Sequence, residues 1–99
     1  MRAEFERRCR AFADGINKIK GFSARMPKGA FYVFANITAT GWESKRLANA
    51  LLEESGVAAL SGASFGQYGE GFLRFSVANS MENLMEALKR IGAWAQRSL

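Results

Sequence analysis

The chain has 99 residues, 48% of them hydrophobic and 12% aromatic, and carries a formal net charge of +5. This length and composition predict one small globular domain and exclude a disordered chain. Because there is no histidine and Cys9 is the single cysteine, Cys/His zinc sites, internal disulfides, and Ser-His-Asp or Cys-His catalytic sites are also excluded. No apolar run reaches the roughly 18 residues of a membrane span and no apolar signal core is visible, so we expect a cytoplasmic protein without a membrane partner.

The first element is a helix expected over residues 1–21, with Gly21 ending it. A cluster of arginines at residues 7–10 could suggest nucleic acid, but it lacks interleaved aromatic residues. We therefore interpret these arginines as a solvated helix face, with no nucleic-acid partner, and Cys9 as a small core residue. The apolar stripe of this helix recurs every three or four residues, at Phe5, Cys9, Phe12, Ile16 and Ile19.

A short strand over residues 22–25 and a turn at Pro27 precede the strongest strand, residues 30–37. Alternation places Tyr32 and Phe34 on one face of this strand and Phe31, Val33 and Ile37 on the other. Both faces are apolar, as in a strand that is covered on both sides. Because the helices of so short a chain can cover only one face, we expect the other face to pack against something else.

The second half of the chain contains two more helices and two more strands. Ser44 is the expected N-cap of a helix with apolar positions Leu47, Ala48, Leu51 and Leu52, which ends at Ser55-Gly56. A strand over residues 57–60 follows, and later a strand over 72–77. Asn79, or Ser80 as a competing cap, begins the last helix. Its expected stripe is Met81, Leu84, Met85, Leu88, Ile91 and Ala95.

This element order predicts an α/β fold of the two-layer α+β kind, over residues 1–99 as a single domain. We expect a small mixed or antiparallel sheet with three helices packed mainly on one face.

A glycine-rich loop, residues 62–71, leads into the strand that carries Arg74. Alternation places Leu73, Phe75 and Val77 on the core face and Phe72, Arg74 and Ser76 on the other. The planar guanidinium of arginine suits a carboxylate, so Arg74 is a candidate anion clamp; a solvated arginine on an edge strand is the alternative.

Nucleotide binding and acid/base catalysis are not supported by this loop. It lacks the Gly-Lys-Ser/Thr ending of a P-loop, and Gly69-Glu70-Gly71 is followed by a strand, without the third glycine of a dinucleotide motif. Glu53, Glu54 and Glu70 have no matching partner in the sequence, and we expect them to face solvent.

Six stretches of the chain match one known family in its order. They are PKGAFYVF (27–34), SKRLA (44–48), LLEESGV (51–57), SGASFG (61–66), GEGFLRFS (69–76) and NSMENL (79–84). With the first helix, they cover nearly the whole chain, which resembles the C-terminal small domain of fold-type I, pyridoxal-phosphate-dependent aminotransferases of class I and II, the aspartate aminotransferase-like group. Ser61 departs from the proline that the family usually has before this glycine.

The resemblance implies roles for five residues. Arg74 corresponds to the arginine that binds the α-carboxylate of the amino-acid or 2-oxo-acid substrate. Phe65 and Gly66 are expected to line the entrance of the cleft and the seam with the large domain. Tyr32 and Phe34 are expected to be interdomain or core residues, which would explain the second apolar face of their strand.

The resemblance also implies that the catalytic centre belongs to the large domain of such an enzyme, which holds pyridoxal phosphate through a lysine. No motif of that large domain is present here, and the lysines of this chain lack such a context. We therefore expect a fragment, an excised domain, or the product of a truncated or split gene, which neither transaminates nor binds the cofactor tightly alone.

Three other functions stay open. The same small domain occurs in pyridoxal-phosphate-dependent lyases and synthases. The chain could also be a stand-alone interaction module that forms a homodimer, or binds a separate large-domain chain, through the face of Tyr32 and Phe34. A nucleic-acid binder acting through the basic first helix is the least favoured.

Overall fold

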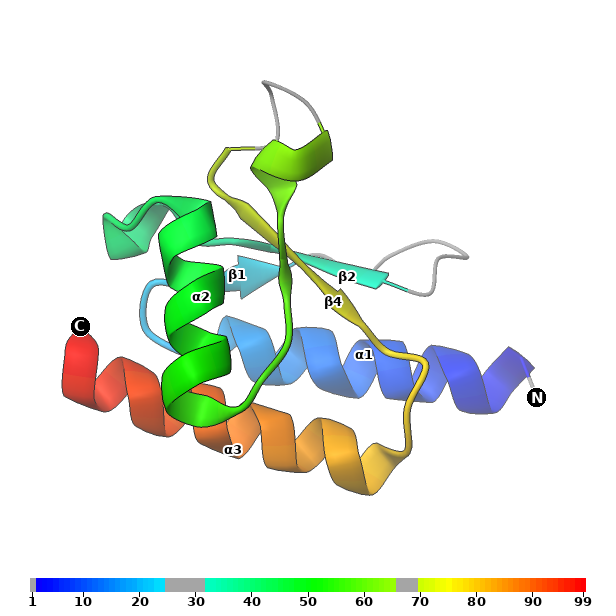
Figure 1. Cartoon of the computed structure of the whole chain (residues 1–99). Coiled ribbons are helices and arrows are strands. Elements are labelled where there is room, and N and C mark those ends of the chain that lie inside the picture. Colours follow the sequence, from blue (N-terminus) through cyan, green and yellow to red (C-terminus); the bar gives the residue numbers. More distant parts are fainter. Residues whose placement is uncertain (1, 25–31, 66–69) are drawn as a thin grey trace.

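The computed structural model of this chain describes residues 2–24, 32–65 and 70–99 (Figure 1). Its helices are α1 (Arg2–Asn17), α2 (Ser44–Ser55) and α3 (Met81–Ser98). Its strands are β1 (Ser23–Ala24), β2 (Tyr32–Asn36), β3 (Leu60–Ser61) and β4 (Phe72–Ser76), and two 3-10 turns are η1 (Thr38–Thr40) and η2 (Gly62–Phe65). The predicted turn at Pro27 lies outside the described residues.

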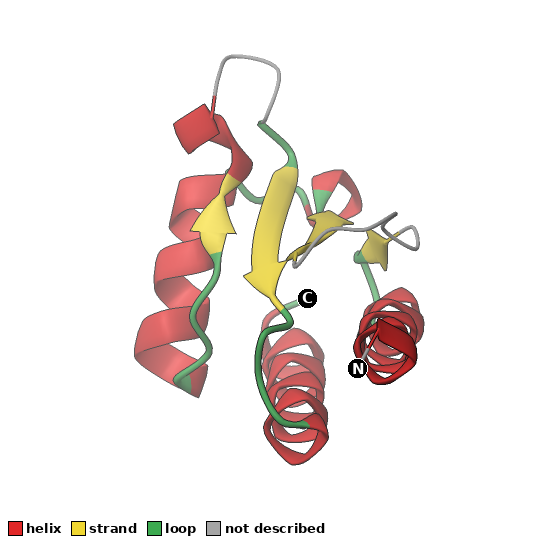
Figure 2. Ribbon diagram, turned by 90° about the vertical axis from the view of Figure 1, so that its right-hand side faces the viewer, coloured by secondary structure: helices red, strands yellow, loops and turns green. Residues whose placement is uncertain are grey.

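The strands form one sheet in the order β1-β2-β4-β3, and each neighbouring pair is antiparallel. Helices α1 and α3 lie next to each other below the sheet, and α2 stands at its β3 edge (Figures 1 and 2). This is the predicted two-layer α+β fold. Of the two predicted kinds of sheet, mixed and antiparallel, the structure has the antiparallel one.

The core lies between the sheet and the helices. Val33 and Ala35 of β2 and Leu73 and Phe75 of β4 point into it, as alternation predicts. The stripe of α1 packs against them, and the Phe12 and Phe75 rings lie 5.4 Å apart at a tilted angle. Cys9 is buried, which confirms its core position, whereas the side chain of Phe5 lies outside the described residues.

Helix α1 ends four residues earlier than predicted. The side chain of Asn17 accepts a hydrogen bond from the Ala24 backbone N–H (2.8 Å) and donates one to the Ala24 carbonyl (2.7 Å). These bonds dock β1 against the end of the helix, and residues 18–21 form turns that finish at Gly21, whose φ is +86°. Gly21 therefore ends the turn that follows the helix instead of the helix itself.

The start of α2 contradicts the expected cap. Glu43 is the N-cap residue and makes no side-chain cap bond, while Ser44 is the first helical residue and is fully buried. The predicted stripe is also too wide, because Leu52 is 55% exposed. Gly56 ends the helix as predicted, in the left-handed region with φ +68°.

Strand β3 is shorter than the predicted strand over residues 57–60. The backbone N–H of Gly56 donates to the Leu52 carbonyl, and that of Val57 donates to the Leu51 carbonyl, which is the hydrogen-bond pattern of a helix C-cap. The cap thus takes up the first residue of the predicted strand, and only Leu60 and Ser61 pair with β4.

Helix α3 begins after Ser80, whose hydroxyl accepts a hydrogen bond from the Asn83 backbone N–H (3.1 Å). Ser80, and not Asn79, is therefore the cap. Trp94 is fully buried although it was not in the predicted stripe, and its ring meets Trp42 edge-on, with centroids 5.1 Å apart. Met85 of the predicted stripe is 40% exposed.

Candidate functional site: the helix-free face of the sheet

One row of side chains crosses three strands on the sheet face away from the helices. Arg74 of β4 lies opposite Phe34 of β2 and opposite Leu60 of β3. Directly opposite residues of an antiparallel pair project from the same face, so these three side chains share one surface. Phe34 and Leu60 are 48% and 50% exposed, whereas Arg74 is half-buried between them. A charged group thus lies in a largely apolar surface.

Arg74 stacks on an aromatic ring of the same face. Its guanidinium carbon lies 4.1 Å from the centroid of the Tyr32 ring, which is within the range of a cation–π interaction. Tyr32 is 37% exposed. The structure therefore places three of the predicted site residues, Arg74, Tyr32 and Phe34, on one face. It corrects the alternative of a core position for Tyr32 and Phe34.

The other two predicted residues lie at the glycine-rich loop. The backbone of Phe65 belongs to η2, and the side chain of Phe65 and all of Gly66 lie outside the described residues. Their expected place at the entrance of a cleft stays a prediction.

Glu70, just before β4, is exposed as predicted, but its carboxylate also accepts hydrogen bonds from neighbouring elements. Its Oε2 accepts hydrogen bonds from the backbone N–H groups of Ser44 (2.9 Å) and Gly71 (3.1 Å). Its Oε1 accepts one from the Ser44 hydroxyl (2.9 Å). These bonds, led by that from the Ser44 backbone and assisted by the charge of Lys45, lower the pKa of the Glu70 carboxyl below its ordinary value of 4.5.

Two buried serines complete this cluster. The hydroxyl oxygens of Ser44 and Ser61 lie 2.6 Å apart, and Ser61 Oγ accepts a hydrogen bond from the Ala63 backbone N–H (3.1 Å). We name Ser44, Ser61 and Glu70 the loop-anchor cluster, because it connects both ends of the loop to α2. Sequence reasoning missed it, since serine is common at helix starts and in loops, and no local pattern pairs residues so far apart.

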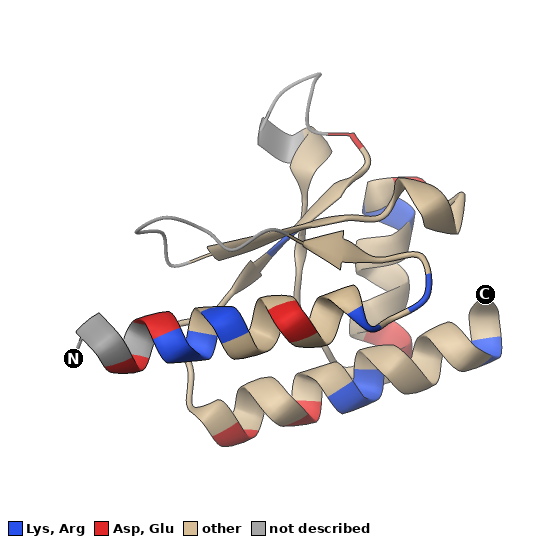
Figure 3. Cartoon of the chain, turned by 180° about the vertical axis from the view of Figure 1, so that it is seen from behind, with Lys and Arg blue, Asp and Glu red and all other residues tan. Residues whose placement is uncertain are grey.

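The arginines of α1 act within the fold. Arg7 and Arg8 form ion pairs with Glu4, and Arg8 also donates to the Asn79 carbonyl (3.0 Å). The hydrogen bond from Arg7 is the main reason that the pKa of Glu4 is lowered. Figure 3 shows basic and acidic residues interspersed along α1 rather than a continuous basic stripe. This agrees with a solvated helix face.

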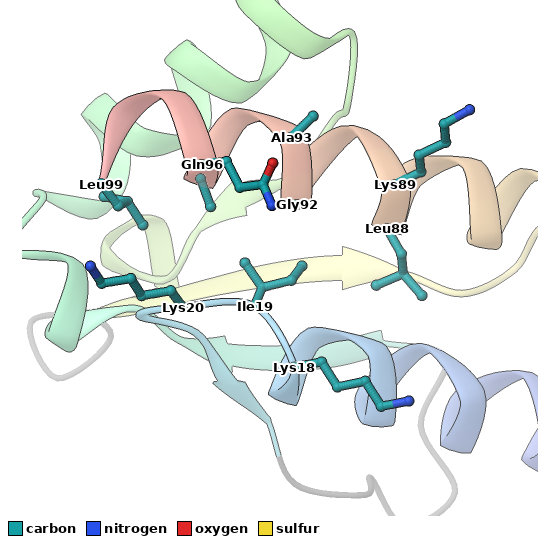
Figure 4. A pocket seen from close by; sticks show the side chains of 10 residues that line it. Lys18, Ile19, Lys20, Leu88, Lys89, Gly92, Ala93, Gln96 and Leu99 are labelled. Carbon is teal, nitrogen blue, oxygen red and sulfur yellow. The ribbon is translucent and has the colours of Figure 1, made fainter.

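A groove between the end of α1 and α3 offers a different environment. It has an apolar floor that includes Ile19 and Leu88, and it is flanked by Lys18, Lys20 and Lys89 (Figure 4). The three ammonium groups point outward in different directions and form no converging site.

The described lysines do not fit a covalent pyridoxal phosphate site. Lys18, Lys20, Lys45 and Lys89 are all exposed, whereas a nucleophilic lysine needs a desolvated pocket that aims it at the cofactor. Lys28 lies outside the described residues. Within the described part of the chain, no cluster of three or more potential metal ligands occurs, and no helix is long and apolar enough to cross a membrane.

Comparison with known proteins places this chain in a family. Residues 1–91 match the sequence profile described as aminotransferase class I and II. Over 91 residues the chain is 41% identical to an aspartate aminotransferase of Pyrococcus horikoshii and to an aromatic-amino-acid aminotransferase of Thermococcus litoralis. In both cases the match covers 92% of this chain and 23% of the relative, so the chain spans about a quarter of the length of these relatives.

Solved structures agree with the sequence matches. An aromatic aminotransferase from Pyrococcus horikoshii superimposes with a TM-score of 0.93 at 38% identity, covering 98% of this chain and 26% of that one. An aspartate aminotransferase from Rhizobium meliloti gives 0.89 at 33% identity, covering 96% of this chain and 26% of that one. The chain therefore belongs to the class I and II aminotransferase family.

Proposed function

We propose that this chain is the C-terminal small domain of a pyridoxal-phosphate-dependent aminotransferase, and that Arg74 binds the α-carboxylate of the amino-acid or 2-oxo-acid substrate. The observation that carries the proposal is the position of Arg74, half-buried on the helix-free sheet face and stacked on Tyr32. An arginine used only for solubility has no need of an aromatic platform on an apolar surface.

The chemistry of this arrangement suits a carboxylate. The Arg74 guanidinium lies over the Tyr32 ring. The N–H donors that form a two-pronged contact with a carboxylate lie in the plane of a guanidinium group. The apolar neighbours Phe34 and Leu60 would exclude water around the ion pair and so strengthen it.

A large domain is the proposed partner of this face. Tyr32, Phe34 and Leu60 leave an apolar surface exposed, and the relatives that match the chain are about four times as long. We propose that the large domain covers this surface and holds pyridoxal phosphate, which supplies the electron sink for amino-group transfer. The contribution of the present chain is to bind and orient the substrate.

The same exposed face supports a second candidate, an association module that works without catalysis. A concentration-dependent mass in light scattering would favour this module, and substituting Phe34 by serine should then abolish the association. A monomer at all concentrations would count against it. Lyase and synthase relatives differ from aminotransferases in large-domain residues, so assays of the full-length enzyme decide the reaction type.

Substitution of Arg74 in the full-length enzyme tests the proposed function. Arg74→Ala should raise the substrate KM and weaken dicarboxylate inhibition by about a hundredfold, since a charged partner is lost from a partly desolvated pair. Arg74→Lys should recover only part of the loss, because lysine keeps the charge but not the planar fork. Arg10→Ala, at an exposed position of α1, is the matched control. Unchanged KM and kcat in Arg74→Ala would contradict the proposal.

The cofactor assignment has its own test. Titration of the 99-residue chain with pyridoxal phosphate, followed by borohydride reduction and peptide mapping, should show no stoichiometric label on any lysine. A single lysine labelled one-to-one would place the cofactor site in this chain and overturn its assignment to the large domain.

A further inference from the structure

We propose that Glu70 is a positioning residue for Arg74: through the loop-anchor cluster it fixes both ends of the glycine-rich loop, and the start of β4, against the first turn of α2. This inference rests on the proposed role of Arg74 as the carboxylate clamp.

The first step is that Glu70 replaces the missing cap of α2. The first N–H groups of a helix have no partner within the helix and are normally bonded by the N-cap side chain. Glu43 makes no such bond, and the Glu70 carboxylate, 26 residues away from Ser44 in sequence, accepts the Ser44 N–H instead. A negative charge at this end also suits the helix dipole.

The second step is the order of the protons in the cluster. A serine hydroxyl has one proton to donate and can accept two hydrogen bonds. If Ser44 donates to ionised Glu70, then Ser61 must donate to Ser44 across their 2.6 Å contact, and Ser61 in turn accepts from the Ala63 N–H. The hydrogen bonds therefore all run in one direction, from the Ala63 N–H through the two serine hydroxyls to the Glu70 carboxylate. They connect the beginning of the loop to its end.

The third step connects this chain to Arg74. Ser61 pairs with Leu73, next to Arg74, so the cluster holds β3 beside the arginine. On the other side, the carbonyl of Gly71 accepts a hydrogen bond from the Ile37 N–H (2.8 Å), which attaches the start of β4 to the end of β2. Glu70 adds the attachment to α2. The backbone that leads to Arg74 is thus attached to three elements: β3, β2 and α2. The hydrogen bonds of Glu70 supply the attachment to α2.

Two substitutions of Glu70 separate positioning from charge. Glu70→Ala removes every bond of the carboxylate. Glu70→Gln can keep the geometry, because its oxygen can accept from the Ser44 and Gly71 N–H groups while its amide donates to Ser44 Oγ, which then donates to Ser61. The bond between the two hydroxyls is kept with its direction reversed, and only the Ser61 proton loses its acceptor. Glu53→Ala is the control, since Glu53 is an exposed residue of α2.

Two measurements are needed. Amide hydrogen exchange on the 99-residue chain should become about tenfold faster at Ser44, Ala63 and Gly71 in Glu70→Ala, and change little at Leu84 in α3. In the full-length enzyme, Glu70→Ala should raise the substrate KM by about tenfold with a smaller effect on kcat, and Glu70→Gln should restore most of the affinity. In an Arg74→Ala background, Glu70→Ala should have almost no further effect on KM.

The outcomes distinguish this inference from the proposed function. If Arg74→Ala raises the KM but Glu70→Ala does not, Arg74 is the clamp and Glu70 does not position it. If the effects of the two substitutions on KM add fully, Glu70 does not act through Arg74, and the inference is likewise overturned. If Arg74→Ala leaves the KM unchanged, the proposed function fails and the positioning role fails with it, while the exchange data still report whether Glu70 anchors the loop.

Discussion

The guanidinium of Arg74 lies 4.1 Å from the centre of the Tyr32 ring, on a neighbouring strand of the sheet. In the register of the sheet, Tyr32 faces Ser76 and Phe34 faces Arg74, so the stacked pair is a diagonal one on a single face. The ring supports the side chain at a fixed place on the surface. In the proposed role of Arg74, this support reduces the conformational entropy that the side chain would lose on binding the substrate carboxylate.

This platform predicts a difference between two substitutions of Tyr32. Tyr32→Leu removes the ring and should raise the substrate KM of the full-length enzyme by about three- to fivefold, the equivalent of a partly exposed cation–π contact. Tyr32→Phe keeps the ring and should behave like the unmodified enzyme. Steady-state kinetics with both variants check this. If the two variants have the same KM, the aromatic face of Tyr32 does not support Arg74.

The faces of the strands could be derived from the sequence alone. Period-two alternation is a property of extended backbone, so it correctly separates buried Leu73 and Phe75 from half-buried Arg74. The same rule predicts that Tyr32 and Phe34 share the free face. The sequence therefore predicts on which face of its own strand each of these site residues lies.

Features that join distant segments could not be derived in this way. Ser44 resembles an N-cap locally, but a carboxylate from another part of the chain bonds its backbone N–H, and the helix begins one residue earlier as a result. Helical periodicity likewise gives the direction of an apolar stripe but not its width. Leu52 and Met85 lie at the borders of their stripes and are exposed, whereas Trp94 is buried by its contact with Trp42.

Trp94 predicts a large stability difference between two core variants. Trp94→Ala would leave a cavity beneath Trp42 and should lower the free energy of unfolding by about 3–5 kcal/mol. Trp94→Phe should cost much less, because it also removes an indole N–H that is buried and has no hydrogen-bond partner among the described residues. Urea unfolding of the 99-residue chain measures both. Equal losses in the two variants would show that the indole N–H is satisfied and contributes to stability.

Gly71 precedes β4 in a conformation that disfavours other residues. Its φ is +95°, and a Cβ atom there would lie 2.6 Å from the Thr38 methyl carbon. Gly71→Ala should therefore reduce the free energy of unfolding by about 2 kcal/mol, through backbone strain and the steric clash together.

The two causes can be separated with a second substitution. Thr38→Ser removes the methyl group and keeps the hydroxyl that donates to Asn36 (2.7 Å). In a Thr38→Ser background, Gly71→Ala should cost only the strain of the left-handed backbone, about half of the original loss. A loss that does not decrease would show that Thr38 has no part in it. Gly41→Ala serves as the reference for backbone strain alone, because its φ is +77° and no described atom beyond its chain neighbours lies within 4 Å of the position of its added Cβ.

The lowered pKa of Glu70 predicts the pH dependence of stability. Above the ordinary glutamate value of 4.5, the carboxyl is ionised in both the folded and unfolded states, and its hydrogen bonds contribute fully. As the pH falls below 4.5, the unfolded state binds the proton first, so the free energy of unfolding decreases. The contribution is lost once the pH has passed through the lower pKa of the folded state. Urea unfolding between about pH 3 and pH 7 follows this loss.

Substitutions of Glu70 and Glu4 show how much each carboxyl group contributes to this loss of stability at low pH. Glu4 also has a lowered pKa and adds to the same decline, mainly through its hydrogen bond with Arg7. Glu70→Gln cannot titrate, so its unfolding free energy should depend less steeply on pH below 4.5, and the double variant with Glu4→Gln less steeply still. Added salt should flatten the Glu4 part more, because the ion pairs of Glu4 are exposed and screened, whereas Glu70 is held chiefly by hydrogen bonds from Ser44. An unchanged pH slope in Glu70→Gln would mean that the carboxylate does not stabilise the folded chain.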